Sequence, residues 1–460
     1  MIRIGEHLGF GFPHASSNVL EDTLGFAWML LVPSGHLIYK HPDAFFLNNT
    51  HALFKNAILQ RHFVSGNFFK VKALHVIPSL AKSQGGPSFA ILAIARSLAS
   101  RGVSVDIIAT AAGIQEEDEL RATAADLKPL GIRVFPFRRQ TSFYKYSSFL
   151  SNWVKAHVSE YDIVHVHALF SHAPTSSALH ARRQAVPYVV RPLGVLNQWG
   201  MKERRPLFKA LSYKYRESKI LANAAAVHFT SRQEQLEAES LGTPLRSVVI
   251  PLGIDLSQLK TRIDSSVFLE RFPETRGRKI ILFLSRIDPK KGLELLIRSF
   301  AVSVRRFPAT CLVIAGHGDS LYVSSLRELV SRLGIENSVV WTGFVDGDQK
   351  RSALSAASIY ALPSHSENFG IAAVEAMATG LPCVLTPGVA ISEGLQESRA
   401  ALVPDSSVDS ISAAFDVLLS TPDLALEIGN NGRSHAFREF EMNTMGERLK
   451  ALYQSLLERE

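Results

Sequence analysis

The chain has 460 residues, of which 46% are hydrophobic and 20% charged, so it is long enough for two domains and has a globular composition. Its two cysteines, Cys311 and Cys383, lie in apolar runs without metal-ligand spacing, which argues against a disulfide framework and favours a reducing, cytoplasmic location. A net charge of +8 favours anionic partners: a nucleotide diphosphate, an acidic membrane surface or nucleic acid. Because no Cys/His finger or aromatic RNA-binding motif is present, we expect no nucleic-acid partner.

The first seventy residues differ from the rest of the chain. They are rich in Phe, His and Asn and show neither a strand nor a helix period, and their longest apolar run, 25–38, is broken by a Pro-Ser pair. Two interpretations of 1–70 stay open. The segment is either a native, loosely folded extension or an upstream addition to a protein whose translation starts at Val71, since no methionine lies between Met29 and Met201. Mass spectrometry of the native protein distinguishes them, because a peptide from this segment excludes the second.

After this segment, short apolar strands alternate with helical stretches such as 88–100. The expected strands of a first series are Lys72–Pro78, Ser104–Ala109, Ile132–Phe135, Asp162–His167, Tyr188–Arg191, Ala226–Thr230 and Val248–Pro251. Those of a second series are Ile280–Ser285, Cys311–Ala315, Val339–Thr342, Ile359–Leu362, Cys383–Leu385 and Ala401–Val403. Such alternation predicts parallel sheets that are covered by helices on both faces.

The polar stretch 255–278 between the two series predicts a linker. We therefore expect an α/β protein with two Rossmann-like, doubly wound domains over 71–258 and 259–440, followed by an amphipathic helix in 441–460. Ligands of such domains bind at the carboxyl ends of the strands, so the region between the domains is the expected site.

The most informative segment is 366–382, in which a loop carboxylate, Glu367, precedes a helix carboxylate, Glu375, by eight residues. A helix is expected over 370–379, and the following Gly-Leu-Pro ends it. A strand, a tight loop and a helix N-terminus together form a phosphate site. Glu367 can then reach hydroxyls of a group attached beyond the phosphate, and Glu375 can accept hydrogen bonds from a vicinal diol such as a ribose. The pattern favours a nucleotide-sugar.

A second motif, 284–292, directly follows a strand and places Arg286 and Lys291 on one loop. Two cations at the carboxyl end of a strand can neutralise a diphosphate and stabilise it as a leaving group. A solvated basic loop would have the same composition, but the nearby carboxylate motif favours the functional interpretation.

With these motifs in view, the chain resembles the GT-B glycosyltransferases of retaining family 4, also called group 1. Seven matching pieces follow the family order from about residue 71 onward: Gly85-Gly86, Asp162–His167, Ile250–Asp255, Arg286 with Lys291-Gly292, Ala315–Gly318, Gly343-Phe344, and Glu367 with Glu375. Seven matches in order are more specific than any single motif.

The resemblance implies a role for each matching residue. Arg286 and Lys291 would bind the donor diphosphate and Glu375 the ribose, while Glu367 would hold the donor sugar and His167 would face the reacting centre. The remaining donor-binding positions would be the backbone of Asn368, Phe369, Gly370 and Ile371, the segment Gly343, Phe344 and Val345 near the base, and Gly85 and Gly86, which lack a side chain that would block close approach.

The resemblance also implies a mechanism without a cofactor or metal. The nucleotide diphosphate would leave from the face that the acceptor attacks, and its phosphate would take the acceptor's proton, so the protein supplies positioning and charge. One Asp-x-Asp string, 346–348, could hold a divalent cation, but the interpretation we favour is that it caps the helix that follows, since Arg286 and Lys291 already offer positive charge.

Three further features have both a functional and a structural interpretation. His165 and His167 share one face of a strand, and we expect His165 to be a packed residue because His167 lies nearer the ligand-binding end. The basic and aromatic run 202–219 could contact an anionic membrane or be a solvated helix. The loop 191–199 could line the acceptor side or be structural.

The sequence thus predicts a transferase that moves a sugar from a nucleoside-diphosphate sugar to a glycan or lipid-linked acceptor in surface polysaccharide synthesis, at the inner face of the membrane or free in the cytoplasm. The pathway follows from family analogy alone. Two alternatives stay open: a GT-B epimerase or phosphorylase, and a catalytically silent scaffold that binds nucleotide or partner proteins.

Overall fold

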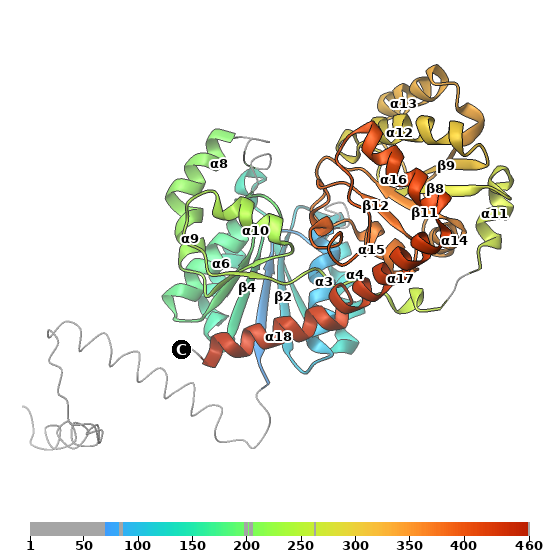
Figure 1. The fold of residues 1–460 in the computed structure, drawn as a ribbon. Coiled ribbons are helices and arrows are strands. Elements are labelled where there is room, and N and C mark those ends of the chain that lie inside the picture. The colour runs from blue at the N-terminus through green and yellow to red at the C-terminus, as the bar shows by residue number, and fades with distance from the viewer. Residues whose placement is uncertain (1–69, 82–85, 197–200, 202–205, 262–263, 459–460) are drawn as a thin grey trace, which may run out of the picture. The chain divides into compact units, whose positions relative to one another are not determined.

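A computed structural model describes residues 70–81, 86–196, 201, 206–261 and 264–458 (Figure 1). The open question about the first seventy residues therefore lies outside the described residues. The described elements form two parallel sheets, each with helices around it. The expected fold class, two doubly wound α/β domains, is confirmed.

The first sheet has seven strands in the order β3-β2-β1-β4-β5-β6-β7, and every pairing is parallel. Its strands are β1 (Lys72–Ile77), β2 (Ser104–Ala111), β3 (Arg133–Arg138), β4 (Ile163–His167), β5 (Tyr188–Arg191), β6 (Ala226–Phe229) and β7 (Ser247–Val249). All seven expected strands are present, with ends that shift by one or a few residues, as is usual where ladders fray.

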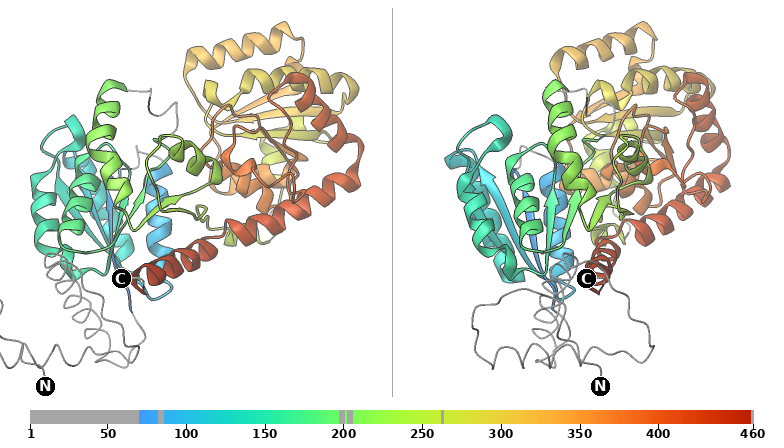
Figure 2. Two further views of the ribbon diagram at one scale, coloured as in Figure 1. Left: turned by 60° about the vertical axis from the view of Figure 1, so that its left-hand side comes forward. Right: turned by 90° about the vertical axis from the view of Figure 1, so that its left-hand side faces the viewer.

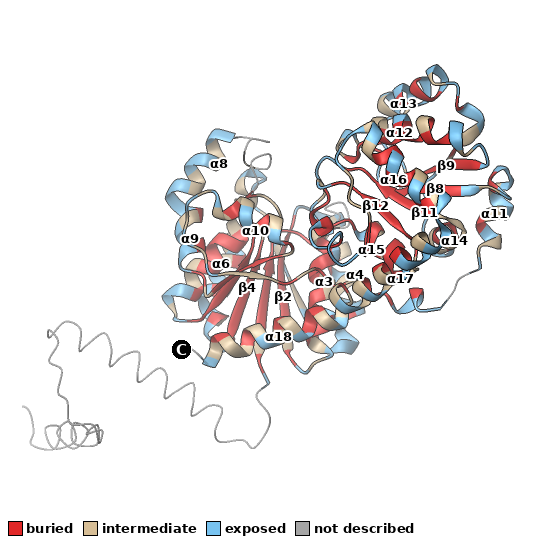
Figure 3. Cartoon of the chain, in the orientation of Figure 1, coloured by how far each residue is buried: buried red, intermediate tan, exposed pale blue. Residues whose placement is uncertain are grey.

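Side chains of each strand alternate between two separate hydrophobic clusters, one on each face of this sheet. On one face Ala73 and Ile77 pack with α3 (Gly86–Ala99) and α4 (Ile114–Leu127). On the other face Leu74 and Val76 pack with residues of α5 (Ser148–His157), α6 (His172–Arg183), α9 (Ser218–Ala222) and α10 (Arg232–Glu239). Figure 3 shows the strands as the most completely buried part of this region.

The second sheet has five parallel strands in the order β10-β9-β8-β11-β12. Its strands are β8 (Lys279–Leu284), β9 (Thr310–Ala315), β10 (Val339–Gly343), β11 (Ile359–Leu362) and β12 (Cys383–Leu385). The helices are α12 (Leu293–Arg306), α13 (Ser320–Arg332), α14 (Gly347–Ala356), α15 (Ile371–Ala378), α16 (Val408–Ser420) and α17 (Pro422–Glu439). Helix α12 packs against α13 and α16, and α15 packs against α17.

Two expectations for this half were wrong. The segment 401–403 is not a strand, because β12 ends at Leu385 and leaves only an isolated bridge between Val384 and Leu402. The stretch 255–278 is not merely a linker, because it contains the helix α11 (Ser266–Arg271), whose Phe268 is buried and which packs against α14. Six residues are too few to show a helical period, so the sequence pattern missed this helix.

The last helix, α18 (Met442–Glu458), packs against α3 of the first sheet, as Figures 1 and 2 show. It buries Leu449, Tyr453 and Leu456 in that contact, and the Ser97 hydroxyl donates a hydrogen bond to the Met442 carbonyl at 2.5 Å. The chain therefore returns to the first sheet after completing the second. This packing partner could not be read from composition.

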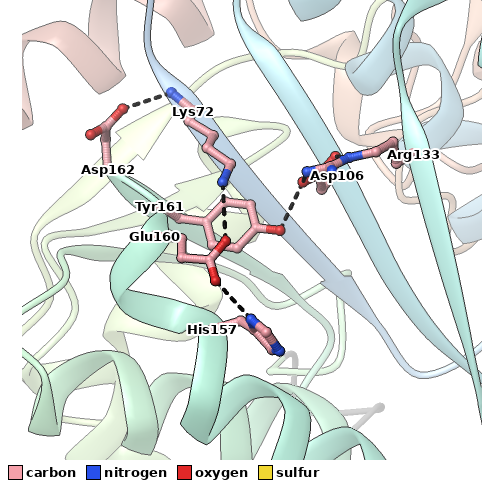
Figure 4. A network of polar contacts seen from close by, with 7 residues as sticks. All are labelled: Lys72, Asp106, Arg133, His157, Glu160, Tyr161 and Asp162. Carbon is pink, nitrogen blue, oxygen red and sulfur yellow. Dashed lines mark hydrogen bonds and ion pairs between the residues drawn. The ribbon is translucent and has the colours of Figure 1, made fainter.

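The amino-terminal ends of β1, β2 and β4 are tied together by the polar network in Figure 4. Asp106 accepts hydrogen bonds from Arg133 Nε at 2.8 Å and from the Tyr161 hydroxyl at 2.7 Å, and Asp162 accepts one from the Lys72 N–H at 2.7 Å. The Lys72 ammonium lies 4.4 Å from the centre of the Tyr161 ring. The polar side chains at this edge bind one another. Ligands are therefore expected at the opposite, carboxyl edge of the strands.

Both cysteines are buried and free, and burial raises the pKa of the Cys311 thiol to about 11. Among the described residues, no helix combines the length and the apolar character needed to cross a bilayer.

Candidate functional site

The loops after β8 and β11 meet at the carboxyl edge of the second sheet. The His365 N–H donates to the Lys290 carbonyl at 2.8 Å, which ties one loop to the other. Gly292 allows this approach: its φ is +68°, and a Cβ there would lie 2.0 Å from the Pro363 carbonyl oxygen. A side chain at position 292 would therefore separate the loops that carry the two predicted motifs.

This contact brings Lys291 and Glu367 together as an ion pair between Nζ and Oε2. Their side chains are only 9% and 20% exposed, so neither charge is fully solvated. Partly buried charges are costly unless they are paired, and removing one partner strands the other. The two motifs that the sequence placed in one site are thus in direct contact, although they lie 76 positions apart.

A second ion pair involves the other predicted carboxylate. Glu375, on α15, accepts from Lys350 Nζ at 2.7 Å, and its side chain is 14% exposed. Lys350 lies on α14, next to the Asp-x-Asp string, and the sequence analysis did not single it out. In this structure the carboxylate expected to hold a diol is therefore occupied by an ammonium group.

Arg286 differs from both lysines. It is exposed, and within the part of the chain that the structure describes it forms no ion pair or side-chain hydrogen bond. It follows β8 directly and precedes the short turn Pro289–Lys291. A cation that is held near the site but not neutralised can bind an incoming anion without first breaking a protein contact.

The predicted phosphate loop leads into α15 as expected. Gly370 occupies the N-cap position with φ +84°, which glycine tolerates, and Ile371 begins the helix. The first N–H groups of a helix lack partners within the helix, and they point outward from its amino-terminal end, where an anion can bind. Phe369 anchors the loop, since its buried ring meets Phe440 edge-on at 5.5 Å between centroids.

The third predicted piece, the segment after β10, is split between surface and core. Phe344 is 62% exposed, and its ring meets His317 edge-on at 5.5 Å, whereas Val345 is buried. Gly343 accepts a hydrogen bond from the Gly316 N–H at 2.8 Å. An exposed aromatic ring beside the charged loops is a surface on which a planar base can stack.

The Asp-x-Asp string lies at the start of a helix, but the expected side-chain cap is absent. Asp346 occupies the N-cap position of α14, but its carboxylate accepts no capping hydrogen bond. Asp348 forms an ion pair with Arg351 one turn later. The two carboxylates therefore serve different local contacts.

The loop after β5 approaches the phosphate loop from the first sheet. Gly194, with φ +70°, lies so close to Asn368 that a Cβ there would be 2.4 Å from the Asn368 amide nitrogen. The Gly194 N–H donates to Glu234 at 2.7 Å, which fixes this loop on α10. The residues 197–199 of the predicted acceptor loop lie outside the described residues.

A cavity of about 680 Å³ lies beside these loops. Its lining comes from α10, including Gln233 and Glu237, and from the segment after β12, including Pro387, Ser392 and Glu397. None of the predicted donor residues lines it. The Glu367 N–H donates to the carbonyl of Gly388 at 2.8 Å, and Gly388 follows the lining residue Pro387 in the chain.

His167 ends β4 and is completely buried, together with His75, His165 and His228. Desolvation lowers the pKa of His75 and of His228 to about 3, and it holds those of His165 and His167 well below the ordinary histidine value. All four rings are therefore neutral at pH 7. The expectation that His165 is a packed residue is consistent with its contact to the Tyr453 hydroxyl at 2.7 Å.

Arg191 lies across the strand pair from His167 and is also buried, at 4% exposure. Its Nε and Nη1 have no hydrogen-bond partner among the described residues. Burial lowers the pKa of this guanidinium to about 10, so the group stays charged at pH 7. Its charge further disfavours protonation of the neighbouring histidines.

Two predicted positions are less informative. Gly85 lies outside the described residues. Gly86 begins α3, and a Cβ there would meet open space, so the structure imposes no steric need for glycine at this position.

The residues of the candidate site and the histidine cluster that the sequence did not indicate share one property: each is recognised only through a partner on another element. Lys350 needed Glu375, and His75, His228 and Tyr453 needed His165. A signal for the histidines existed, since β1 and β6 each carry one histidine and β4 carries two, all on one face of the sheet.

Comparison with known families gives two matches that together cover most of the described chain. Residues 85–253 match the glycosyl transferase 4-like domain, and residues 267–435 match the glycosyl transferases group 1 domain.

Curated relatives point the same way at low identity. A GDP-mannose-dependent α-(1-6)-phosphatidylinositol monomannoside mannosyltransferase of Mycolicibacterium smegmatis is 29% identical over 50% of this chain and 62% of its own length. The chain thus spans less than two thirds of that relative. A phosphatidyl-myo-inositol mannosyltransferase of the same organism is 28% identical over 74% of this chain and 82% of its own length.

Among solved structures, HepE of Anabaena in complex with UDP superposes with a TM-score of 0.68. The alignment covers 84% of this chain and 100% of HepE at 20% sequence identity. That level of identity carries the fold only.

Proposed function

Because the chain belongs to the group 1 glycosyltransferases, with a family 4-like amino-terminal half, we propose that it transfers a sugar from a nucleoside-diphosphate sugar to a hydroxyl of an acceptor. The observation that carries this proposal is the convergence of Arg286, Lys291 and Glu367 at one sheet edge. The UDP complex of HepE and the GDP-mannose dependence of the mycobacterial relative support a nucleotide-sugar as the donor class.

In this proposal the charged loops do the electrostatic work. Arg286 binds the incoming diphosphate first, since it has no competing ion pair among the described residues. Lys291 then exchanges part of its contact with Glu367 for the phosphate, and Glu367 becomes available to sugar hydroxyls. Fixed cations stabilise the charge that develops on the leaving diphosphate more than the charge of the bound donor, which accelerates transfer.

Glu375 takes the ribose diol in the same scheme. Its present partner, Lys350, would either be displaced or stay as a second contact of the carboxylate. Retention of the anomeric configuration would follow from departure of the diphosphate on the face that the acceptor attacks, with the leaving phosphate accepting the acceptor's proton. No step in this scheme requires a metal ion or a cofactor.

For the acceptor we propose a glycan or lipid-linked molecule at a membrane surface. The described part of the basic segment comprises α8 (Pro206–Ser212) and a turn of π-helix (Tyr213–Glu217). Leu207, Leu211 and Tyr215 are 80%, 59% and 63% exposed, and their spacing of four places them along one side of the helix. Exposed apolar side chains beside basic ones are typical of helices that lie at an anionic bilayer surface.

The donor is tested first by thermal unfolding of the full chain with UDP, GDP and ADP and their sugar conjugates. A ligand that binds the native state raises the melting temperature with concentration. We expect one nucleotide to stabilise the protein selectively and the variant Lys291→Ala to lose that effect. Arg298→Ala is the matched control, because it removes an exposed cation from α12, outside the two predicted motifs.

Two outcomes would contradict the donor proposal. If none of the nucleotides stabilises the protein, a silent scaffold that binds partner proteins is favoured. If sugar transfer is unchanged in both Glu367→Ala and Lys291→Ala, the site assignment is wrong.

The membrane contact is tested by sedimentation with vesicles of phosphatidylcholine and phosphatidylglycerol. We expect binding that increases with the anionic lipid fraction and is lost in the double variant Leu207→Asp/Leu211→Asp. Leu321→Asp is the control, because Leu321 is equally exposed, at 80%, but lies on α13 of the other sheet. Equal binding of all three proteins would show that α8 is only a solvated helix.

A further inference from the structure

Four histidines and one tyrosine form a continuous buried hydrogen-bonded chain on one face of the first sheet. His228 lies 2.9 Å from the Ile250 carbonyl through Nε2 and 3.5 Å from His165 Nε2 through Nδ1. His165 Nδ1 lies 2.7 Å from the Tyr453 hydroxyl, which lies 3.3 Å from His75 Nε2. The last contact joins His75 Nδ1 to His167 Nε2 at 3.0 Å.

The direction of every hydrogen bond in this chain follows from its first member. A carbonyl oxygen can only accept, so His228 must carry its proton on Nε2. A neutral ring has one donor and one acceptor, so His228 Nδ1 accepts from His165 Nε2. His165 Nδ1 is then unprotonated and accepts a hydrogen bond from the Tyr453 hydroxyl.

The same logic continues past the tyrosine. Burial raises the pKa of the Tyr453 hydroxyl, so it keeps the single proton that it gives to His165, and its oxygen accepts from His75 Nε2. His75 Nδ1 is consequently unprotonated and accepts a hydrogen bond from His167 Nε2. His167 Nδ1 is left as a bare acceptor, and it has no hydrogen-bond partner among the described residues.

We propose that Tyr453, from the carboxyl-terminal helix, is a positioning residue that acts through His75 to hold His167 with its proton on Nε2. Nδ1 of His167 is then a fixed acceptor for a ligand hydroxyl at the carboxyl end of β4. The ligand in this statement rests on the proposed function, whereas the protonation pattern of the rings does not.

Without the tyrosine the pattern would lose its direction. In a neutral histidine the choice of protonated nitrogen is set by the hydrogen bond that the other nitrogen makes. Removing the Tyr453 hydroxyl leaves His75 Nε2 without its acceptor, so His75 can carry its proton on Nδ1 and donate to His167 Nε2. His167 would then present an N–H at Nδ1, which cannot accept from a hydroxyl.

The competing interpretation is a metal site, because ring nitrogens of His75, His165 and His167 all lie within 4.8 Å of one another. The surroundings disfavour it. The three rings are fully buried, and the charged group beside them is Arg191, whose positive charge lowers the pKa values of His165 and His167. A divalent cation would add two buried positive charges without a carboxylate ligand from this group, which is costly.

The test uses the full chain labelled with ¹⁵N-histidine and two-bond ¹H–¹⁵N correlation spectra, which distinguish the two neutral tautomers from each other and from the charged ring. We expect His75, His165, His167 and His228 all to be neutral with the proton on Nε2 from pH 6 to pH 8. Substitution of each histidine by Gln in turn assigns its signals. A wild-type spectrum with His167 protonated on Nδ1 would overturn the proposal without any variant.

The second measurement compares Tyr453→Phe with Tyr188→Phe. Both changes remove a buried hydroxyl that makes one strong hydrogen bond. The Tyr188 hydroxyl, however, donates to the Ile220 carbonyl and makes no hydrogen bond with the four histidines. We expect His167 to gain the Nδ1-protonated form in Tyr453→Phe only. Transfer activity should fall by about tenfold in the same variant, the upper range for one neutral hydrogen bond.

Each alternative has its own result. An unchanged His167 tautomer in folded Tyr453→Phe overturns the proposal. A stoichiometric metal ion in the purified chain that is lost in His75→Gln establishes the metal site instead. If wild-type protein shows the expected tautomers but transfers no sugar, the proposed function fails and the positioning role stands.

Discussion

The carboxyl edge of the seven-stranded sheet carries buried, neutral histidines, whereas that of the five-stranded sheet carries partly exposed ion pairs. At the first edge His75, His165 and His167 are fully buried, and the direction of the hydrogen bonds between them depends on which ring nitrogen holds the proton. At the second edge the side chains of Lys291 and Glu367 keep 9% and 20% of their exposure and meet as opposite charges.

The difference shows how one chain can recognise two parts of a ligand. Neutral hydrogen bonds are directional and lose their value if donor and acceptor are exchanged, so they suit the orientation of hydroxyl groups. An ion pair can exchange one of its charged partners for a ligand charge, so the charged edge suits a diphosphate. The helix α18 joins the two regions, because it follows α17 of the second half and contributes Tyr453 to the first.

The largest effect is expected on the free energy of unfolding at acidic pH, and it should arise from the buried histidines of the first edge. The pKa values of His75 and His228 are near 3 in the folded protein and near 6.5 in the unfolded chain. Below pH 6.5 the unfolded state therefore binds more protons than the folded state. As a result, the free energy of unfolding decreases as the pH is lowered from about 6.5 to about 3. Each such histidine contributes about 1.4 kcal/mol per pH unit in this window.

Guanidinium unfolding monitored by circular dichroism at pH 7 and pH 5 measures this slope. The variant His228→Asn should have a smaller slope than wild type, whereas His317→Gln, outside the cluster, should keep it. A wild-type slope that is unchanged by His228→Asn would mean that the cluster is charged or open in solution.

The next largest effect is expected at the charged edge. Lys291→Ala should lower the rate of sugar transfer by about 100-fold or more, because a cation that stabilises the leaving diphosphate is removed. It also leaves Glu367 without its partner. Because the two residues act on each other, the double variant Lys291→Ala/Glu367→Gln should lose less than the product of the two single losses.

Initial rates of transfer for the two single variants and the double variant give the coupling energy directly. Strictly multiplicative losses would show that the ion pair does not persist in the working enzyme.

The sequence was sufficient for the repeating strand–helix pattern of both halves. Buried parallel strands are short apolar runs, so Ile359–Leu362 and Cys383–Leu385 were predicted at their observed bounds. It was not sufficient for 401–403, because an apolar triplet becomes a strand only if a neighbour is long enough to pair with it. The six-residue helix α11 was missed for the complementary reason, since its single buried side chain shows no period.

The candidate site was predictable where function requires particular residue types in one loop. Arg286, Lys291, Glu367 and Glu375 were predicted from two short segments, and the structure brings Lys291 and Glu367 into contact. Partners that act across elements were not predictable, because neither spacing nor composition indicates that Tyr453 on α18 reaches the same ring as His228 on β6. Three-dimensional register is needed to see that network.

A smaller effect is expected for the diol contact. Glu375→Gln should weaken binding of a nucleoside diphosphate about tenfold, the lower range for a hydrogen bond to a charged group. Calorimetry with a nucleoside diphosphate and its 2′-deoxy analogue measures this. Wild type should prefer the ribose form, and the variant should not. Glu427→Gln, which removes an exposed carboxylate paired with Arg399, is the control. Equal discrimination by Glu375→Gln would place the ribose elsewhere.

The smallest effect is expected for divalent cations, and it would complete the contrast between the edges. If the positive charge at the second edge comes from Arg286 and Lys291, EDTA should change nucleotide affinity by less than about twofold, because protein cations and a metal ion would serve the same phosphate oxygens. Asp346→Asn/Asp348→Asn should likewise bind nucleotide normally, since Asp348 already pairs with Arg351 and Asp346 begins α14. Calorimetry with and without Mg²⁺ checks both expectations. A tenfold loss in EDTA that is reproduced by the double variant would mean that the charged edge recruits its cation from solution, and that the lysine pairs orient the ligand instead of neutralising it.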